Sequence, residues 1–326
     1  MRRLTIAIER FPIAGSFVIA RGAKTEAVTV VATLHEGDFR GRGECVPYAR
    51  YGESPESVMA AIEGVRPALE AGADKYELQA LLPAGAARNA LDCALWDLEA
   101  KRTGVPAYRL AGLDRLPVAT TAFTLSVGTP QEMAAAAEHA SARPLLKVKL
   151  AGDGDAERIA AVRAAAPDAD LIVDANESWR RGNLIANLAA CARAGVRLIE
   201  QPLPAGGDEA LAEVAHDVAI CADESVHDRA GLAALKGRYE AINVKLDKTG
   251  GLTEALALVA EAERLGFGVM IGCMVASSLA MAPALLLAAK ARFVDLDGPL
   301  LLARDRPDGL IYDGSLVHPP NPALWG

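Results

Sequence analysis

The sequence predicts an α/β protein, a modified TIM barrel of the (β/α)7β type with an α+β capping domain. Eight short apolar runs follow one another from about residue 117, and alanine-rich helical stretches separate most of them. Alternation of this kind gives a parallel sheet, and eight units suffice to close a barrel. Charged residues also end successive runs at intervals of 22 to 26 residues: Lys149, Asp174, Glu200, Asp223 and Lys245.

Residues 1–113 have a different rhythm and predict the capping domain, joined by the C-terminal segment 299–326. Alternating apolar and polar residues over 17–37 indicate antiparallel strands with a turn near Gly22. Ser54-Pro55-Glu56 is typical of a helix start, and this helix should run to about Ala71. A second, amphipathic helix is expected over 86–104. The tail HPPNPALWG is too rich in proline for a helix, so we expect it to pack on this first module.

The catalytic barrel is predicted over residues 114–298. Its eight apolar runs lie near Ala122, Val148, Ile172, Ile199, Ile220, Val244, Met270 and Val294. Residues 265–289 carry no charge and are long enough to span a bilayer, but glycines, serines and Pro283 interrupt them. We interpret this stretch as a short strand, a turn and a buried helix of a soluble protein. The last unit should lack a regular helix.

Composition narrows the class of protein. The chain has 326 residues, 52% of them hydrophobic and 23% charged, as in ordinary globular proteins. A net charge of −8 argues against a nucleic-acid partner. The five scattered cysteines form no CxxC pair, and Glu9 and Arg10 interrupt any signal-peptide core. We therefore expect a cytoplasmic protein without a membrane partner, and the oligomeric state stays open, a homo-oligomer included.

Three carboxylates follow successive strands at the expected rim, and they predict a site for Mg²⁺. Asp174, Glu200 and Asp223 supply hard oxygen ligands and leave positions open for water or substrate. A single such aspartate would more often cap a helix or carry a solvated charge. Three on successive strands reverse those odds, because close like charges repel without a cation. Asn176 and Glu224 are assigned to the support of these ligands.

Lysines on opposite sides of the predicted ring indicate proton transfer. Lys147 and Lys149 are two residues apart on the second strand and point the same way, whereas Lys245 ends the sixth strand. Salt bridges to the carboxylates are the alternative, which we favour for one of the lysines. Two lysine strands facing each other indicate two bases on two faces of a substrate. Neighbouring cations should lower the pKa of such a lysine and make a neutral amine available.

Four further residues are assigned to substrate binding. Asp295 and Asp297 face one way from the last strand, where they would bind a cationic group or brace a loop with equal odds. Arg21 lies in a glycine-containing turn and would reach an anionic group, although a lone surface arginine usually has no specific role. Thr124, on the first barrel strand, is assigned to the same site.

The chain resembles the enolase superfamily, in its muconate-lactonising subgroup. The matching motifs are KVK (147–149), VDAN (173–176), IEQP (199–202), ADES (222–225) and NVKLDKTGG (243–251), in the family's order. FVIARG (17–22), PYARYGE (47–53), GCMVASS (272–278) and DLDG (295–298) resemble dipeptide epimerases most, in particular those that act on L-Ala-D/L-Glu. We see no departure from the family pattern at the catalytic positions.

The resemblance implies Mg²⁺ and 1,1-proton transfer at the α-carbon of a small dipeptide, in the recycling of cell-wall peptides. It implies that Lys149 and Lys245 serve as base and acid while Lys147 binds the substrate carboxylate. It further implies that Asp295 and Asp297 bind the dipeptide's ammonium and that Arg21 binds the glutamate side chain. The rivals are other dipeptide epimerases, o-succinylbenzoate synthase, N-acylamino acid racemase and a non-catalytic metal-binding relative.

Overall fold

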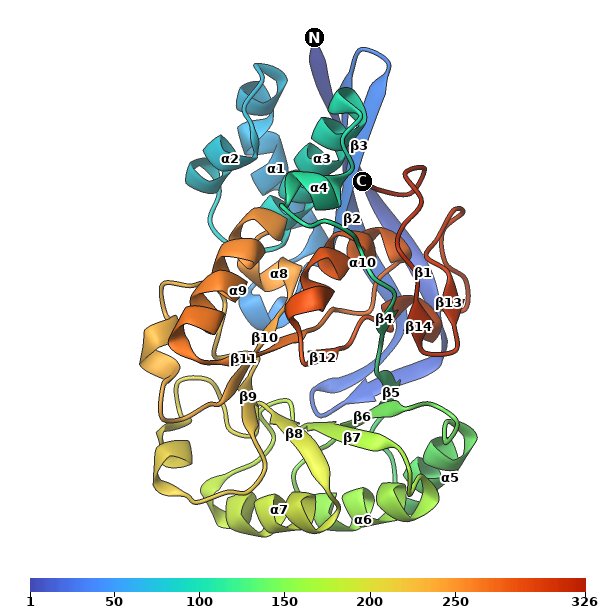
Figure 1. Ribbon diagram of the computed structural model, residues 1–326, viewed down its shortest axis with the longest axis vertical. Coiled ribbons are helices and arrows are strands. Elements are labelled where there is room, and N and C mark those ends of the chain that lie inside the picture. Colours follow the sequence, from blue (N-terminus) through green and yellow to red (C-terminus); the bar gives the residue numbers. More distant parts are fainter.

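The computed structural model describes all 326 residues and shows an antiparallel sheet with helices above a curled parallel sheet (Figure 1). Strands β1 (Arg2–Ile19), β2 (Gly22–Glu36) and β3 (Phe39–Cys45) form the antiparallel sheet. Helices α1 (Pro55–Glu70), α2 (Lys75–Leu81) and α3 (Ala86–Thr103) pack against it. A Cβ atom on Gly43 would lie 2.1 Å from the Ala90 carbonyl oxygen, so glycine is what allows β3 to approach α3 this closely.

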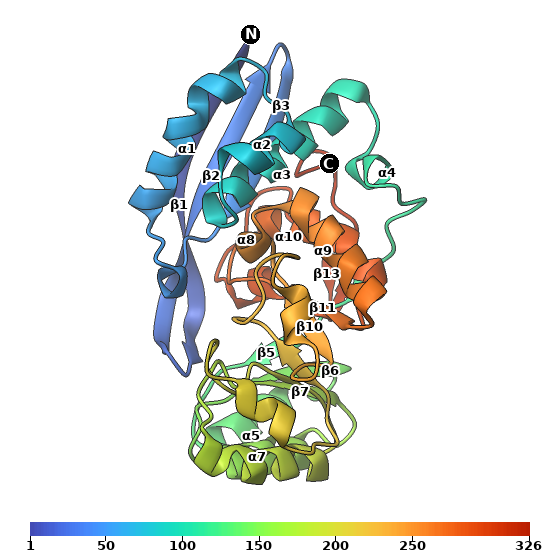
Figure 2. The ribbon, with the colours of Figure 1, turned by 90° about the vertical axis from the view of Figure 1, so that its left-hand side faces the viewer.

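Helix α1 begins as the sequence predicts. The Ser54 hydroxyl accepts a hydrogen bond from the Ser57 backbone N–H, and Pro55 occupies the first turn. The long β1–β2 hairpin runs down beside α1 towards the barrel (Figure 2). Near the hairpin's end, the Val127 N–H donates to the Val18 carbonyl oxygen at 3.0 Å. The turn that follows Ile19 is thereby placed over the mouth of the barrel.

The barrel is an eight-stranded parallel sheet in which the strands follow sequence order. Its strands are β5 (Phe123–Leu125), β6 (Leu145–Lys149), β7 (Asp170–Asp174), β8 (Val196–Glu200), β9 (Ile220–Ala222), β10 (Ala241–Val244), β11 (Gly268–Ile271) and β12 (Phe293–Val294). A parallel bridge from Thr121 to Val294 joins the two edges. Eight strands at the expected places confirm the predicted fold class.

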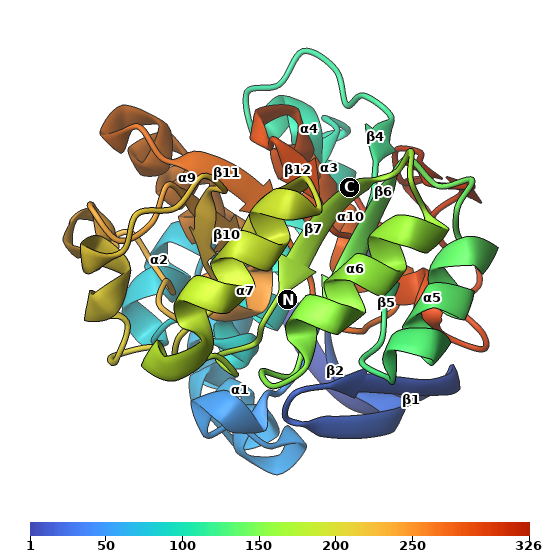
Figure 3. The same ribbon diagram turned by 90° about the horizontal axis from the view of Figure 1, so that it is seen from below.

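Helices cover the outside of the barrel, and in Figure 3, which looks from below, some of them lie side by side in front of it. These are α5 (Pro130–His139), α6 (Asp155–Ala165) and α7 (Arg181–Arg193); α9 (Leu252–Leu265) lies farther round. The uncharged stretch 265–289 forms β11, a loop and helix α10 (Ser278–Ala284), as predicted. No helix of the structure has both the length and the apolarity needed to cross a bilayer. After β12 the only helical segment is a short 3-10 turn over Gly298–Leu301.

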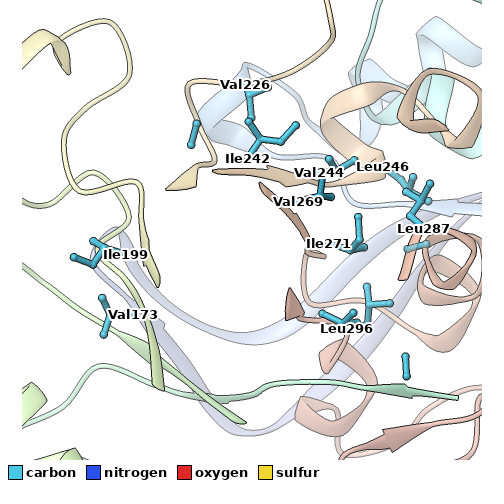
Figure 4. Packing of buried hydrophobic residues seen from close by; sticks show 14 of the residues in the cluster. Val173, Ile199, Val226, Ile242, Val244, Leu246, Val269, Ile271, Leu287 and Leu296 are labelled. Atoms are coloured by element: carbon cyan, nitrogen blue, oxygen red, sulfur yellow. The ribbon is translucent and has the colours of Figure 1, made fainter. Parts of the chain in front are cut away.

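Side chains that point out of the barrel pack under the helices. Val173 and Ile199 lie on neighbouring strands, and Val244, Val269 and Ile271 lie across the sheet (Figure 4). A second buried layer fills the barrel itself and takes one residue from each of the eight units: Ala122, Leu145, Ile172, Leu198, Cys221, Ala241, Met270 and Phe293. Since side chains alternate along a strand, residues two positions later also point inward. The members of this layer therefore identify the inward-pointing side chains of the next layer, nearer the C-terminal ends of the strands.

The C-terminal segment packs on the first module, as expected. The buried Trp325 indole donates to the Cys93 carbonyl oxygen at 3.0 Å, and Arg42 donates to the Leu324 carbonyl oxygen at 2.9 Å. One pairing was not foreseen. Strand β4 (Ala119–Thr120), just before the first barrel strand, forms a small separate sheet with β13 (Tyr312–Asp313) and β14 (Leu316–Val317). The short helix α4 (Ala107–Leu110) lies between the two modules in sequence.

Candidate functional site

Apart from Arg21 and Glu224, the predicted site residues lie above the apolar layer of the barrel, two or four positions after its members. Alternation places seven side chains in the next layer: Thr124, Lys147, Asp174, Glu200, Asp223, Asn243 and Asp295. Lys149, Lys245 and Asp297 follow two residues later. The structure has a cavity of about 830 Å³ at this mouth, and the β1–β2 turn and residues 46–51 of the first module form its other wall. One cavity is therefore built from both modules.

Asp174, Glu200 and Asp223 lie on three consecutive strand ends and are almost fully buried. Asp174 and Glu200 are direct partners in the β7–β8 register, and Asp223 follows β9. Burial, and then the charge of the nearby Asp174, raise the pKa of Glu200 to about 7. Burial also opposes ionisation of Asp174, but the ammonium groups of Lys149 and Lys147 lower its pKa to about 2. Lys245 and Lys248 likewise hold the pKa of Asp223 well below its usual range, so the surroundings favour the ionised form of both aspartates and oppose that of Glu200.

Every lysine predicted for catalysis forms an ion pair with one of these carboxylates. Lys147 Nζ lies 2.7 Å from both Glu200 Oε2 and Asp295 Oδ2. Lys149 Nζ lies 2.6 Å from Asp174 Oδ2, and Lys245 Nζ lies 2.6 Å from a carboxylate oxygen of Asp223. Strands β6 and β10 are four apart in the sheet order, so the two lysine strands face each other across the ring.

The expected lowering of the lysine pKa is wrong for Lys147 and Lys245. Burial does lower both pKa values, but the surrounding carboxylates outweigh it and raise them well above the ordinary value. For Lys245 the main opposing charges are Asp223 and Glu200. Folding places carboxylates against both amines, and the attraction of these anions exceeds the repulsion from neighbouring cations on which the expectation rested. A lysine here becomes a base only where another cation takes up the charge of the carboxylates.

The acidic trio fits a hard divalent cation in its donor chemistry, although its oxygens do not converge on one point. No three acidic, histidine or cysteine side chains lie at the distances of a formed metal shell. Each carboxylate turns instead towards a lysine, because opposite charges attract and like charges repel in a buried site. Glu200 Oε2 nevertheless accepts no hydrogen bond of proper geometry, so it is a buried carboxylate oxygen that is available to bind a metal ion. Carboxylate oxygens of this kind are ligands for Mg²⁺.

Asp295 and Asp297 follow β12 and line the cavity. Asp297 Oδ2 accepts a hydrogen bond from the Thr124 backbone N–H at 2.7 Å. Burial, and then the charge of Asp295, raise the pKa of Asp297 to about 7. Asp295 Oδ1 has no hydrogen-bond partner. Lys147 is the cation that pairs with Asp295, and Asp297 accepts only a backbone hydrogen bond, so a ligand's cation would be stabilised between these two carboxylates.

Arg21 reaches the cavity but already has anionic partners in the barrel. Its guanidinium lies 2.7 Å from Glu224 and 3.2 Å from Glu177, and it donates to the Tyr48 hydroxyl at 3.0 Å. Arg50 forms two hydrogen bonds of 2.8 Å to the same Glu177. Glu224, assigned from the sequence to the support of the metal ligands, is thus the ion-pair partner of Arg21. Asn176, the other residue assigned to ligand support, donates its backbone N–H to Asp174 Oδ1 at 2.9 Å.

Three residues of the cavity or its rim, Lys24, Asn243 and Lys248, are not among those predicted from the sequence. Lys24 lines the cavity, 5.1 Å above the Tyr48 ring, and takes part in no ion pair. Asn243 donates to Glu200 Oε1 at 2.7 Å, and Lys248 pairs with Asp223. The inward parity of β10 would have identified Asn243, since it precedes Lys245 by two residues. Lys248 lies within the NVKLDKTGG motif, whereas no local pattern distinguishes Lys24 from ordinary surface lysines.

Known protein families and relatives match this chain over nearly its whole length. The family description "Mandelate racemase / muconate lactonizing enzyme, N-terminal domain" matches residues 1–112, and "Enolase C-terminal domain-like" matches residues 131–313. An L-Ala-D/L-Glu epimerase of Escherichia coli is 52% identical, over 98% of this chain and 100% of its own length. An N-acetyl-D-glutamate racemase of a Pseudoalteromonas species is 46% identical, over 91% and 95%.

Solved structures agree. An enolase family member from Agrobacterium tumefaciens with homology to dipeptide epimerases, crystallised with sodium and L-Ala-L-Glu, is 54% identical with a TM-score of 0.99 over the full length of both chains. A dipeptide epimerase from Methylococcus capsulatus, complexed with Mg and L-Arg-D-Lys, is 32% identical with a TM-score of 0.90, over 99% of this chain and 98% of its own. Two family matches that together cover most of the chain, with the barrel and the strand-end carboxylates and lysines in the family's order, place it in the enolase superfamily, on the mandelate racemase/muconate lactonizing branch.

Proposed function

We propose that the protein is a Mg²⁺-dependent dipeptide epimerase that acts on L-Ala-D/L-Glu by 1,1-proton transfer. The observation that carries the proposal is the pair of lysine strands facing one cavity, with three buried carboxylates between them along the ring. The names of the similar proteins support the dipeptide class. We further propose that residues 114–298 are the catalytic barrel, that 1–113 with 299–326 form the capping domain, and that the enzyme recycles cell-wall peptides in the cytoplasm.

In this proposal, Asp174, Glu200 and Asp223 bind the metal ion. When bound, Mg²⁺ stabilises the negative charge that develops on the substrate's carboxylate oxygens. Lys147 adds a charge-assisted hydrogen bond to the same carboxylate from below. Its ammonium is buried, and its raised pKa keeps it charged for this purpose.

Lys149 and Lys245 transfer the proton at the α-carbon. One amine removes the proton from one face and the other ammonium returns a proton to the opposite face, and the roles exchange with the direction of reaction. Lys149 is paired with Asp174 and Lys245 with Asp223. Each base is thus held by a carboxylate that the ion would share, so the charge state of the amines is linked to occupation of the acidic site.

The charges of the cavity fit the three charged groups of an Ala-Glu dipeptide. The α-carboxylate would lie at Lys147, and the ammonium would lie between Asp295 and Asp297. For the side-chain carboxylate we propose Lys24 together with the predicted Arg21. Lys24 has no anionic partner to give up, whereas Arg21 is shared between Glu224 and Glu177.

A racemase of N-acylated amino acids is the second candidate, because one similar protein carries that name at 46% identity. Such a substrate has no ammonium, and two adjoining buried carboxylates would then face a neutral amide. Ionising both without a cation is unfavourable. The aspartate pair therefore favours the dipeptide over the N-acylated substrate.

Deuterium exchange tests the proposal directly. The protein with Mg²⁺ in D₂O should incorporate deuterium at the glutamate α-carbon of L-Ala-D-Glu, and it should do so faster than with N-acetyl-D-glutamate. Faster exchange with the N-acetylated compound would establish the second candidate. No exchange with either would remove both.

The side-chain subsite has its own test. Lys24→Met should raise KM for L-Ala-L-Glu more than for L-Ala-L-Met, which has no side-chain carboxylate. Lys236→Met, at an exposed lysine remote from the cavity lining, is the matched control. Equal effects on both dipeptides would show that Lys24 does not bind the glutamate side chain.

A further inference from the structure

Gln201, the residue after Glu200, has an unusual backbone conformation for its type. It is fully buried, and its φ of 34° lies in the left-handed region. A residue other than glycine in such a region costs of order 1–3 kcal/mol, and it persists only where its surroundings determine it. Asn176 and Glu177, which follow Asp174, also have positive φ values of 45° and 67°. The strain therefore lies beside two of the three carboxylates.

The hydrogen bonds of Gln201 reach all three strands that carry the acidic trio. Its side-chain Oε1 accepts from the backbone N–H of Asp223 at 2.9 Å and of Ser225 at 3.1 Å. Its backbone oxygen accepts from the Glu177 N–H at 2.9 Å, and its own N–H donates to the Cys221 carbonyl oxygen at 2.8 Å. One residue thus links the loop after β7, the end of β8 and the end of β9.

The amide nitrogen of Gln201 is held on its other side by a buried polar cluster. Nε2 lies 2.8 Å from the Leu203 carbonyl oxygen, 2.9 Å from Ser225 Oγ and 2.8 Å from the Tyr239 hydroxyl. Ser225 and Tyr239 both donate to Asp208 Oδ2, at 2.7 Å and 2.5 Å. Oxygens on one side and N–H groups on the other allow only one orientation of the amide. The amide oxygen is therefore fixed towards Asp223.

We propose that Gln201 is a positioning residue that sets Asp223 relative to Glu200, and that it thereby determines the affinity of the acidic site for a divalent cation. Its backbone places Glu200 while its amide oxygen fixes the backbone of Asp223, so both donors share one rigid support. Without the amide, the Asp223 N–H is buried and unpaired, and Gln201 holds the end of β9 only through the bond from its backbone N–H to the Cys221 carbonyl oxygen. The inference rests on the proposed metal-ligand roles of Asp174, Glu200 and Asp223.

Calorimetric titration of Mg²⁺ into the protein without substrate tests this inference. Gln201→Met keeps the length of the side chain and removes its hydrogen bonds. It should raise the Kd for Mg²⁺ by about 10- to 100-fold, the range found when groups supporting metal ligands are removed. Gln79→Met is the matched control, because the Gln79 amide also donates to a buried aspartate, Asp92, but within the first module. The control should bind Mg²⁺ like the wild type.

A second variant keeps the test decisive if Gln201→Met does not fold. Tyr239→Phe removes only the hydroxyl that links the Gln201 amide to Asp208. It should raise the Kd for Mg²⁺ at least about threefold, which corresponds to about 0.7 kcal/mol of binding free energy. A folded Gln201→Met with the Kd of the wild type would overturn the proposal, as would an unchanged Kd in Tyr239→Phe where the first variant is unfolded. A wild-type protein that does not bind Mg²⁺ would instead refute the metal assignment itself.

Discussion

Replacement of Asp297 by asparagine separates the two candidate substrates most sharply. Asparagine has nearly the same shape, and its carbonyl oxygen can still accept the hydrogen bond from the Thr124 N–H. Only the charge is removed. A dipeptide with a free ammonium should therefore lose a charged partner in the Asp297→Asn variant, whereas an N-acetylated amino acid should not.

The size of the effect follows from the surroundings of Asp297. Burial and Asp295 raise its pKa from 3.8 to about 7, so ionising it in the free cavity costs about 4 kcal/mol relative to water. An ammonium between the two aspartates offsets that cost. Hydrogen bonds to charged groups contribute about 1.5–3 kcal/mol, so kcat/KM for L-Ala-L-Glu at pH 8 should fall by about 10- to 150-fold.

The dependence on pH has a definite sign. Because the pKa of Asp297 is raised, the free enzyme holds this carboxyl protonated below about pH 7. The wild-type kcat/KM for a dipeptide should then decrease about tenfold per pH unit below that value, since the ammonium requires the ionised form. The variant should lack this limb. Asp313→Asn, on an exposed hairpin, is the control that keeps it.

Steady-state assays of L-Ala-L-Glu and N-acetyl-D-glutamate from pH 5.5 to 8.5 would decide the matter. An equal loss for both substrates in Asp297→Asn, or an unchanged acidic limb in the variant, would refute the assignment of the ammonium to this pair.

Three other perturbations have clear expected outcomes. Lys149→Met and Lys245→Met should each lower epimerisation by about 10²–10⁴-fold, measured by polarimetry, and a variant with normal turnover would lose its assigned role. Removal of divalent cations with EDTA should stop deuterium exchange and added Mg²⁺ should restore it, whereas exchange that persists in EDTA would exclude the metal. Burial raises the pKa of Asp247 from 3.8 to about 7, so the folded state binds more protons and this residue's contribution to the free energy of unfolding should fall by up to about 4 kcal/mol as pH rises from about 4 to 7. Asp247→Asn should flatten that slope in urea titrations, because asparagine does not titrate, while its carbonyl can still accept from Val46 and Asn89 and so keep the local structure. Parallel pH curves for the two proteins would contradict this.

Much of the fold was predictable because its signals are local. Each barrel strand is an apolar run followed by a charged residue, and alternation along the strand decides which residue points inward. Leu145, Lys147 and Lys149 share one face for this reason, and Thr124 and Glu200 follow the same parity. The pairing of Ala119–Thr120 with residues 316–317 was not predictable, since it joins segments nearly 200 residues apart and competes with addition to the barrel.

The sequence by itself determined the barrel, the order of the carboxylates and lysines around its rim, and the family, because strand spacing and side-chain parity are properties of the chain. Only the tertiary structure decided how these charges balance: that Arg21 is already paired and Lys24 is not, that carboxylates raise the pKa of Lys245, and that Gln201 joins three strands. The physical reason is distance. Electrostatic and hydrogen-bond energies depend on separations of a few ångströms between residues far apart along the chain, and folding alone sets those separations.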